Sequence, residues 1–165
     1  MGHHKAIDLY RRMPDFFEQA FKFSIGRNPF DRLVSTYNFI RSRGTAHGWV
    51  KWYSEYDDPL MRNFDSFITS WLPKYGTEST GVLLQIQSSY LCNLKGEIMV
   101  DYVGKLENLE DIERRLSKQL NRAIEIPFVN VNENKIAKEV YFSDAMKAVV
   151  RDLYKLDFEL LGYSV

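Results

Sequence analysis

The sequence is poor in cysteine, in long apolar runs and in net charge, and each shortage excludes a class of protein. Cys92 is the single cysteine, so an intramolecular disulfide is impossible, and no Cys/His cluster has metal-ligand spacing. No apolar run approaches the ~20 residues that span a bilayer, and the first residues show no secretory signal. We therefore expect a protein of a reducing, cytoplasmic compartment, with no metal and no transmembrane segment.

The net charge is zero, but the charges are unevenly distributed. The chain has 22 basic and 22 acidic residues. Residues 1–51 carry nine Lys or Arg against four Asp or Glu, whereas residues 52–113 carry four against eleven. This asymmetry predicts a local anion site in the first third and argues against a nucleic-acid surface.

The length and the order of the elements predict the fold class. A chain of 165 residues, 45% hydrophobic and 15% aromatic, suits one globular domain spanning residues 1–165. Apolar runs predict two short strands, and helical spacing with capping residues predicts three longer helices. Strands that alternate with helices indicate an α/β fold with a small parallel sheet flanked by helices. The strands are expected at 21–26 and 98–104, and the helices at 29–42, 107–120 and 143–161.

Shorter elements and loops fill the rest of the chain. A short helix is expected before Pro14, and a helix over residues 64–72 is expected to stop at Pro73. Residues 44–63 and 124–135 are predicted loops. The segment 82–92 fits neither a strand nor a helix clearly.

The stretch "FSIGRNPFDRLVSTY" places an arginine and a serine where they suit an anion. Arg27 follows the first predicted strand, and ligands of parallel sheets bind beyond the carboxyl ends of strands. At ~100° per residue, Ser35 points away from the apolar stripe of its helix. A guanidinium fork and a hydroxyl suit a phosphate monoester. The alternative is an ion pair from Arg27 to a neighbouring carboxylate, with Ser35 merely solvated.

The same stretch resembles a known nucleotide-binding motif. "RNPFDRLVSTYNF" is similar to the Arg-x-Pro-x-x-Arg-Leu-x-Ser-x-Tyr motif of the sulfotransferases that use 3′-phosphoadenosine 5′-phosphosulfate (PAPS), especially carbohydrate sulfotransferases of family 2. Two further regions match in order: "VDYVGKLENLEDIERRL" resembles the family's Gly-x-x-Glu-x-Leu segment, and "IPFVNVNENK" with "YKLDFELLGY" resembles its C-terminal end. The resemblance covers residues 3 to 163.

The resemblance implies a P-loop-NTPase-like sulfotransferase fold that transfers a sulfuryl group from PAPS to a hydroxyl of a carbohydrate-type acceptor. PAPS would be the cosubstrate and adenosine 3′,5′-bisphosphate (PAP) the product. Arg27 and Ser35 would hold the 3′-phosphate. Arg32 and Lys105 are further cofactor-binding candidates.

One family element has no counterpart in the expected place. The turn close to Pro-Lys-x-x-Gly-Thr-Ser, which holds the 5′-phosphosulfate, should precede the strand at 21–26, and only about twenty residues precede it. "LPKYGTEST" at 72–80 has a similar composition but follows a predicted helix, whereas a phosphate cradle follows a strand. We therefore expect an N-terminally truncated domain. The alternative function is a non-catalytic or truncated nucleotide-binding or interaction module on the same scaffold.

Three residues are candidates for the catalytic base. The start "GHHKAIDLY" resembles the histidine region of glycosaminoglycan 2-O-sulfotransferases, which implies His3 as the base and His4 as the second choice. Imidazole suits this role because it is largely neutral near pH 7. Solvated histidines without a role are the alternative. Glu107 is the third candidate, and it can equally favour the start of the helix that follows.

An aromatic loop is a candidate for binding the ligand's flat faces. Four aromatic residues of the loop 44–63 can stack on adenine or a sugar, or simply pack into the core: Trp49, Trp52, Tyr53 and Tyr56. His47 in the same loop suits a structural role or a place beside the acceptor.

Overall fold

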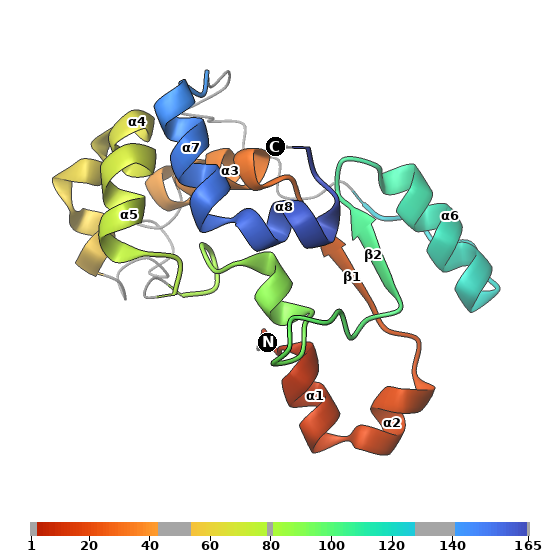
Figure 1. The fold of residues 1–165 in the computed structure, drawn as a ribbon. Coiled ribbons are helices and arrows are strands. Elements are labelled where there is room, and N and C mark those ends of the chain that lie inside the picture. Colours follow the sequence, from red (N-terminus) through yellow and green to blue (C-terminus); the bar gives the residue numbers. More distant parts are fainter. Residues whose placement is uncertain (1–2, 43–53, 79–80, 128–140, 165) are drawn as a thin grey trace. The chain divides into compact units, whose positions relative to one another are not determined.

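A computed structural model describes residues 3–42, 54–78, 81–127 and 141–164 (Figure 1). The chain divides into two compact units, and each combines two separate stretches of sequence. The first unit comprises Met1–Asn28 and Gln87–Val131, and the second comprises Pro29–Ile86 and Asn132–Val165. Among the described residues, no helix has both the length and the apolar character needed to cross a lipid bilayer.

The first unit is built on two parallel strands (Figure 1). Phe23 pairs with Tyr102 at one end of the sheet, and Gly26 pairs with Lys105 at the other. The predicted strands are thus confirmed, although β2 begins later than expected. Residue Ile98 instead forms an isolated antiparallel bridge with Cys92. The elements in chain order are α1 (Ala6–Arg12), α2 (Pro14–Gln19), β1 (Phe23–Gly26), the 3-10 helix η5 (Gln87–Tyr90), β2 (Tyr102–Lys105) and α6 (Leu109–Leu120).

Helix α6 packs closely on strand β2. Its buried side chains are Ile112 and Leu116, one turn apart on the same face. A Cβ atom added to Gly104 of β2 would lie 2.5 Å from Cγ1 of Ile112. Only glycine therefore allows this approach of helix and strand. Asn108 caps the helix by accepting a hydrogen bond from the Asp111 N–H at 3.2 Å.

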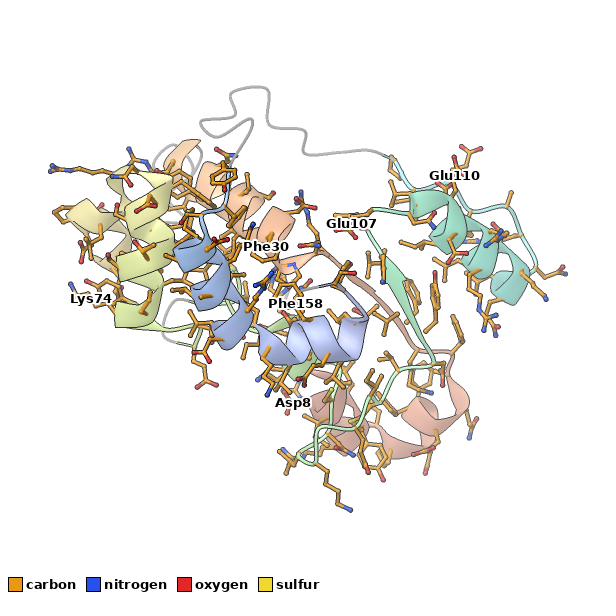
Figure 2. All side chains as sticks on the ribbon, turned by 45° about the horizontal axis from the view of Figure 1, so that its top comes forward. Asp8, Phe30, Lys74, Glu107, Glu110 and Phe158 are labelled. Atoms are coloured by element: carbon orange, nitrogen blue, oxygen red, sulfur yellow. The ribbon has the colours of Figure 1, made fainter. Side chains whose placement is uncertain are left out.

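The second unit is helical and encloses an aromatic core. Its elements are α3 (Pro29–Ser42), the 3-10 helices η2 (Ser54–Asp57) and η3 (Pro59–Arg62), α4 (Phe64–Ser66), the π-helix η4 (Phe67–Trp71), α5 (Leu72–Tyr75), α7 (Asp144–Leu153) and α8 (Lys155–Leu161). Phe67, Ile68 and Trp71 are completely buried, and they pack with Val150 of α7 in the same cluster. In Figure 2, Phe30 and Phe158 face each other, with ring centroids 5.3 Å apart.

Helix α3 has the predicted boundaries and the predicted buried face. Leu33, Tyr37 and Ile40 are buried, whereas Ser35 is exposed. Thr36 and Asn38 are also buried, which the apolar pattern did not indicate. The hydroxyl of Thr36 lies 3.5 Å from the Leu83 carbonyl, so burial beside a backbone acceptor satisfies it.

The prediction that Pro73 ends the helix at 64–72 is wrong. The helical run continues through Pro73 to Tyr75 and ends at Gly76, whose φ of 73° is favourable only for glycine. Pro73 is tolerated because it occupies one of the first positions of α5, directly after the π-helical turn, where its missing N–H breaks no α-helical ladder.

The single helix expected over residues 143–161 is wrong, because the structure divides it into two helices, α7 and α8. Ser143 caps α7 as predicted, accepting from the Met146 N–H at 3.3 Å. The backbone leaves the helical conformation at Tyr154, which separates α7 from α8. The buried Tyr154 hydroxyl donates to the Leu84 carbonyl at 2.8 Å, and burial raises the pKa of this phenol. The hydrogen bond of its side chain thus holds Tyr154 in place at the break between α7 and α8.

Candidate functional site

The carboxyl ends of the two strands bring several predicted site residues to one edge of the first unit. Lys105 pairs with Gly26, the residue before Arg27, and Leu106 N–H donates to the Gly26 carbonyl at 2.8 Å. Glu107 follows two residues after Lys105 and lies in the turn between β2 and α6 (Figure 2). The sheet therefore places Arg27, Lys105 and Glu107 at the same edge, as parallel pairing predicts.

Arg27 has a fixed backbone and a side chain without a partner in the described part of the chain. Its backbone N–H and carbonyl both bond to the side chain of Gln87, at 2.9 and 2.8 Å. The residue is half-buried. Within the described residues, its guanidinium forms neither a hydrogen bond nor an ion pair. The structure thus provides no carboxylate partner there for the alternative of an internal ion pair.

Glu107 binds the backbone next to Arg27. Its Oε1 accepts a hydrogen bond from the Asn28 N–H at 2.7 Å. The cap of α6 is Asn108, so Glu107 does not cap that helix itself. Its carboxylate instead ties the end of β2 to the loop that follows β1. This contact suits a positioning role, and proton abstraction by Glu107 stays a prediction.

The two helical candidates, Arg32 and Ser35, belong to the second unit. Arg32 Nη2 donates to the Leu83 carbonyl at 3.1 Å and lies 3.4 Å from the Val82 carbonyl. Ser35 is exposed, and its hydroxyl has no hydrogen-bond partner within the described part of the second unit. Arg32 thus helps to hold the segment 82–84, while Ser35 presents a hydroxyl to the surface of α3.

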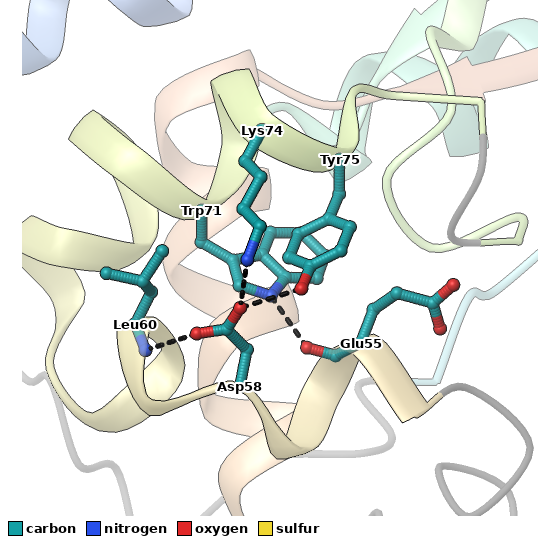
Figure 3. A network of polar contacts seen from close by, with 6 residues as sticks. All are labelled: Glu55, Asp58, Leu60, Trp71, Lys74 and Tyr75. Atoms are coloured by element: carbon teal, nitrogen blue, oxygen red, sulfur yellow. Dashed lines mark hydrogen bonds and ion pairs between the residues drawn. The ribbon is translucent and has the colours of Figure 1, made fainter.

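Lys74, the lysine of "LPKYGTEST", belongs to a polar network with a structural role (Figure 3). Its Nζ donates to Asp58 Oδ2 at 2.8 Å, and the Tyr75 hydroxyl donates to the same oxygen at 2.7 Å. Asp58 Oδ1 accepts from the Leu60 N–H at 2.9 Å. The hydrogen bonds from Lys74, Leu60 and Tyr75, in that order of effect, lower the pKa of Asp58 to about 2.

The described part of this segment, residues 72–78, lacks the features of a phosphate loop. A helical run, α4 to α5, leads into it where a phosphate cradle needs a strand. Its lysine is engaged by a carboxylate, and Thr77 is buried. The lysine and the threonine therefore serve packing and hydrogen bonding within the second unit.

A comparison with known protein families decides the assignment. The family model described as "Sulfotransferase family" matches residues 3–164 of this chain. The chain belongs to the sulfotransferase family. No curated protein and no solved structure matches it significantly. Membership confirms the family that the motifs of residues 27–37 and 104–109 indicated, and it assigns the chain to an enzyme family whose general reaction is sulfotransfer.

The histidine candidates of this chain precede α1. His3 and His4 are exposed and make no hydrogen bond or ion pair with other described residues. Ala6, three residues after His3, is buried as the first residue of α1. The role of either histidine as a base stays a prediction. No group of three or more potential metal-ligating side chains occurs in the described ranges.

The aromatic loop at residues 44–63 is described only in part. His47, Trp49, Trp52 and Tyr53 lie outside the described residues. Tyr56 is buried, and its ring stacks on Trp71 with centroids 5.6 Å apart. Tyr56 is therefore a core residue, which corresponds to the packing alternative.

Gln87 is the residue at this edge that the sequence analysis missed. It begins η5, in the segment 82–92 whose pattern fits neither helix nor strand. Its two bonds to Arg27 span 60 residues of sequence. No local periodicity signals such a contact, because it depends on a side chain reaching a distant strand end.

Proposed function

We propose that this sulfotransferase transfers a sulfuryl group from PAPS to a hydroxyl of a carbohydrate-type acceptor. The observation that carries the proposal is Arg27, a guanidinium at the carboxyl end of β1 that no described carboxylate neutralises. The family match across residues 3–164 supports the reaction class. The match spans both units, and we propose that they act together as one domain with a P-loop-like α/β architecture.

In this proposal Arg27 binds the 3′-phosphate through a bidentate pair of N–H groups, and the Ser35 hydroxyl adds a directional hydrogen bond. Lys105 and Arg32 supply further positive charge. The 3′-phosphate distinguishes PAPS from most other adenine nucleotides, so these residues provide specificity for the donor. Sulfuryl transfer itself occurs at the other end of the nucleotide.

The chemical step needs a base for the acceptor hydroxyl. The acceptor oxygen attacks sulfur, the bond from sulfur to the bridging oxygen of the 5′-phosphate breaks, and the electron pair leaves on that oxygen as PAP forms. The hydroxyl proton passes to the base. His3 is the first candidate and His4 the second. Glu107 is a weaker candidate because its carboxylate already accepts the Asn28 N–H.

A non-catalytic nucleotide-binding module is the second candidate function. The observation that favours it is Lys74, which pairs with Asp58 and leaves the segment 72–77 without a free lysine for a 5′-phosphosulfate. Such a module would bind PAP through the same Arg27 and Ser35 but would transfer no sulfate.

Calorimetry and thermal unfolding with PAP test the proposal. A ligand at a hundredfold excess over its Kd stabilises a protein by about 2.7 kcal/mol, which is an easily measured shift. We expect the shift to be much smaller in Arg27→Ala at the same PAP concentration, because the variant binds PAP more weakly. Arg122→Ala is the matched control, since Arg122 is an exposed arginine of the same unit whose guanidinium has no partner in the described part of the chain. No shift in the wild-type protein at millimolar PAP contradicts the proposal.

Transfer from radiolabelled PAPS to carbohydrate acceptors separates the two candidates. His3→Gln should abolish transfer while the affinity for PAP stays unchanged, because the base does not contact the 3′-phosphate. If transfer persists in both His3→Gln and His4→Gln, neither histidine is the catalytic base. PAP binding without any transfer by the wild-type chain favours the non-catalytic module.

A further inference from the structure

The side chain of Gln87 bonds to both backbone groups of Arg27. Its Oε1 accepts from the Arg27 N–H at 2.9 Å, and its Nε2 donates to the Arg27 carbonyl at 2.8 Å. Both distances are typical of good hydrogen bonds. A carboxamide can provide this pair because it carries an acceptor and a donor side by side. The two contacts therefore fix residue 27 as a neighbouring strand would.

Residue 27 needs such a partner because β1 ends just before it. The last paired residue is Gly26, opposite Lys105. Backbone polar groups of a half-buried residue are normally satisfied, and beyond the strand end no ladder is left to do so. Gln87 itself is held by η5, where Ser88 is buried and the Leu91 N–H donates to the Ser88 carbonyl at 3.0 Å. The clamp thus comes from an ordered element.

A second side chain holds the next residue. Glu107 accepts from the Asn28 N–H, so two successive backbone N–H groups of this loop point to protein side chains. Neither N–H is left to bind an anion. An anion bound here must then be held by side chains, and the fixed backbone limits the positions that the Arg27 guanidinium can reach.

We propose that Gln87 is a positioning residue, which holds the backbone of Arg27 so that its guanidinium meets the 3′-phosphate of the nucleotide. This inference rests on the proposed function, because it takes PAP as the ligand of Arg27. Gln87 does not touch the phosphate itself. Its effect on binding passes through Arg27 alone, and that is what distinguishes positioning from a general contribution to folding.

A double-mutant cycle tests this dependence. Gln87→Met keeps the length of the side chain and removes both hydrogen bonds, and Gln119→Met on the exposed face of α6 is the matched control. We expect Gln87→Met to lower the affinity for PAP about tenfold, the effect of a lost hydrogen-bond pair. The affinity for adenosine 5′-monophosphate, which has no 3′-phosphate, should stay unchanged. In the Arg27→Ala background, Gln87→Met should have no further effect.

Equal losses of affinity for the two nucleotides, or the same loss with and without Arg27, overturn the positioning role. If Gln87→Met lowers the melting temperature too far for binding studies, Gln87→Asn replaces it. That variant keeps an uncharged carboxamide on a shorter side chain, which weakens the two bonds to Arg27 without adding charge, so a smaller loss with the same selectivity is expected.

Hydrogen exchange tests the clamp without any ligand. The Arg27 amide should exchange slowly in the wild-type protein and at least tenfold faster in Gln87→Met, with no change in Gln119→Met. Unchanged exchange refutes the clamp. If the wild-type chain does not bind PAP, the proposed function fails, the link to the 3′-phosphate fails with it, and the exchange rates alone decide whether Gln87 holds residue 27.

Discussion

Two segments of this protein contain a cation close to a proline and a glycine, and they use it in opposite ways. In "GRNPF" at 26–30, side chains from elsewhere bind the backbone, and the Arg27 guanidinium has no partner among the described residues. In "LPKYGT" at 72–77, the Lys74 ammonium itself is bound by Asp58. In the first segment the positive charge of Arg27 is available to a ligand. In the second, the charge of Lys74 is neutralised by Asp58.

Arg27→Ala should produce the largest difference between the two segments. Hydrogen bonds to charged groups contribute about 1.5–3 kcal/mol, so losing the guanidinium should weaken PAP binding by roughly ten- to a hundredfold. Lys74→Ala should leave PAP affinity unchanged and lower the melting temperature. Calorimetric titration of both variants measures this contrast. If Lys74→Ala lowers PAP affinity as much as Arg27→Ala does, the proposed difference between the two segments is wrong.

Gly104→Ala tests how much the close packing of α6 on β2 contributes to the stability of the first unit. The added methyl group overlaps Ile112, and overpacking of this kind costs about 1–3 kcal/mol. We expect a lower free energy of unfolding in urea. The exposed Ala123→Gly is a control for a change of similar size outside the contact. Unchanged stability would mean that the helix shifts without cost.

Asp58→Asn should change how the stability depends on pH. The native pKa of Asp58 is about 2, below the ordinary carboxyl value, so the native state binds fewer protons than the unfolded state between these values. The stabilisation by this carboxylate is therefore complete above about pH 4 and is lost as the pH falls towards 2. Asp58→Asn should be less stable at neutral pH and should lose part of this acid dependence. Asp57→Asn, in the neighbouring exposed position, is the control.

Ser35→Ala should have the smallest effect. A single hydroxyl contributes about 0.5–1.5 kcal/mol, so PAP affinity should fall by about two- to tenfold. The melting temperature without ligand should not change, because Ser35 is exposed. A fall in melting temperature without any loss of PAP affinity would contradict the assignment.

Much of the fold followed from local signals in the sequence. Pro29 at a helix start and the apolar spacing of Leu33, Tyr37 and Ile40 predicted α3 correctly, and the Ser143 cap predicted the start of α7, because these signals act within a few residues. The break between α7 and α8 was not predicted. Pro73 misled the prediction, since the π-helical turn before it is set by packing of Phe67 and Trp71 in the core. Local sequence gives no sign of that turn.

The site was predictable where it depends on strand ends and not where it depends on long-range side-chain contacts. The position of Arg27 and Lys105 at one edge follows from the parallel pairing of two short strands. The Gln87 clamp joins residues 60 apart, and the Asp58 network joins a loop to a helix 16 residues later. Such contacts form only when distant segments have come together, so no motif within one segment predicts them.

The division of the chain into interleaved stretches has a consequence for its synthesis. The second unit needs residues from α3 and also Val150 and Phe158 near the C-terminus, while β1 must wait for a strand that is made 79 residues later. Closing such long loops costs entropy before any contact compensates for it. Neither unit can be complete on the ribosome until much of the other has been made, and no single cut yields either as a continuous fragment.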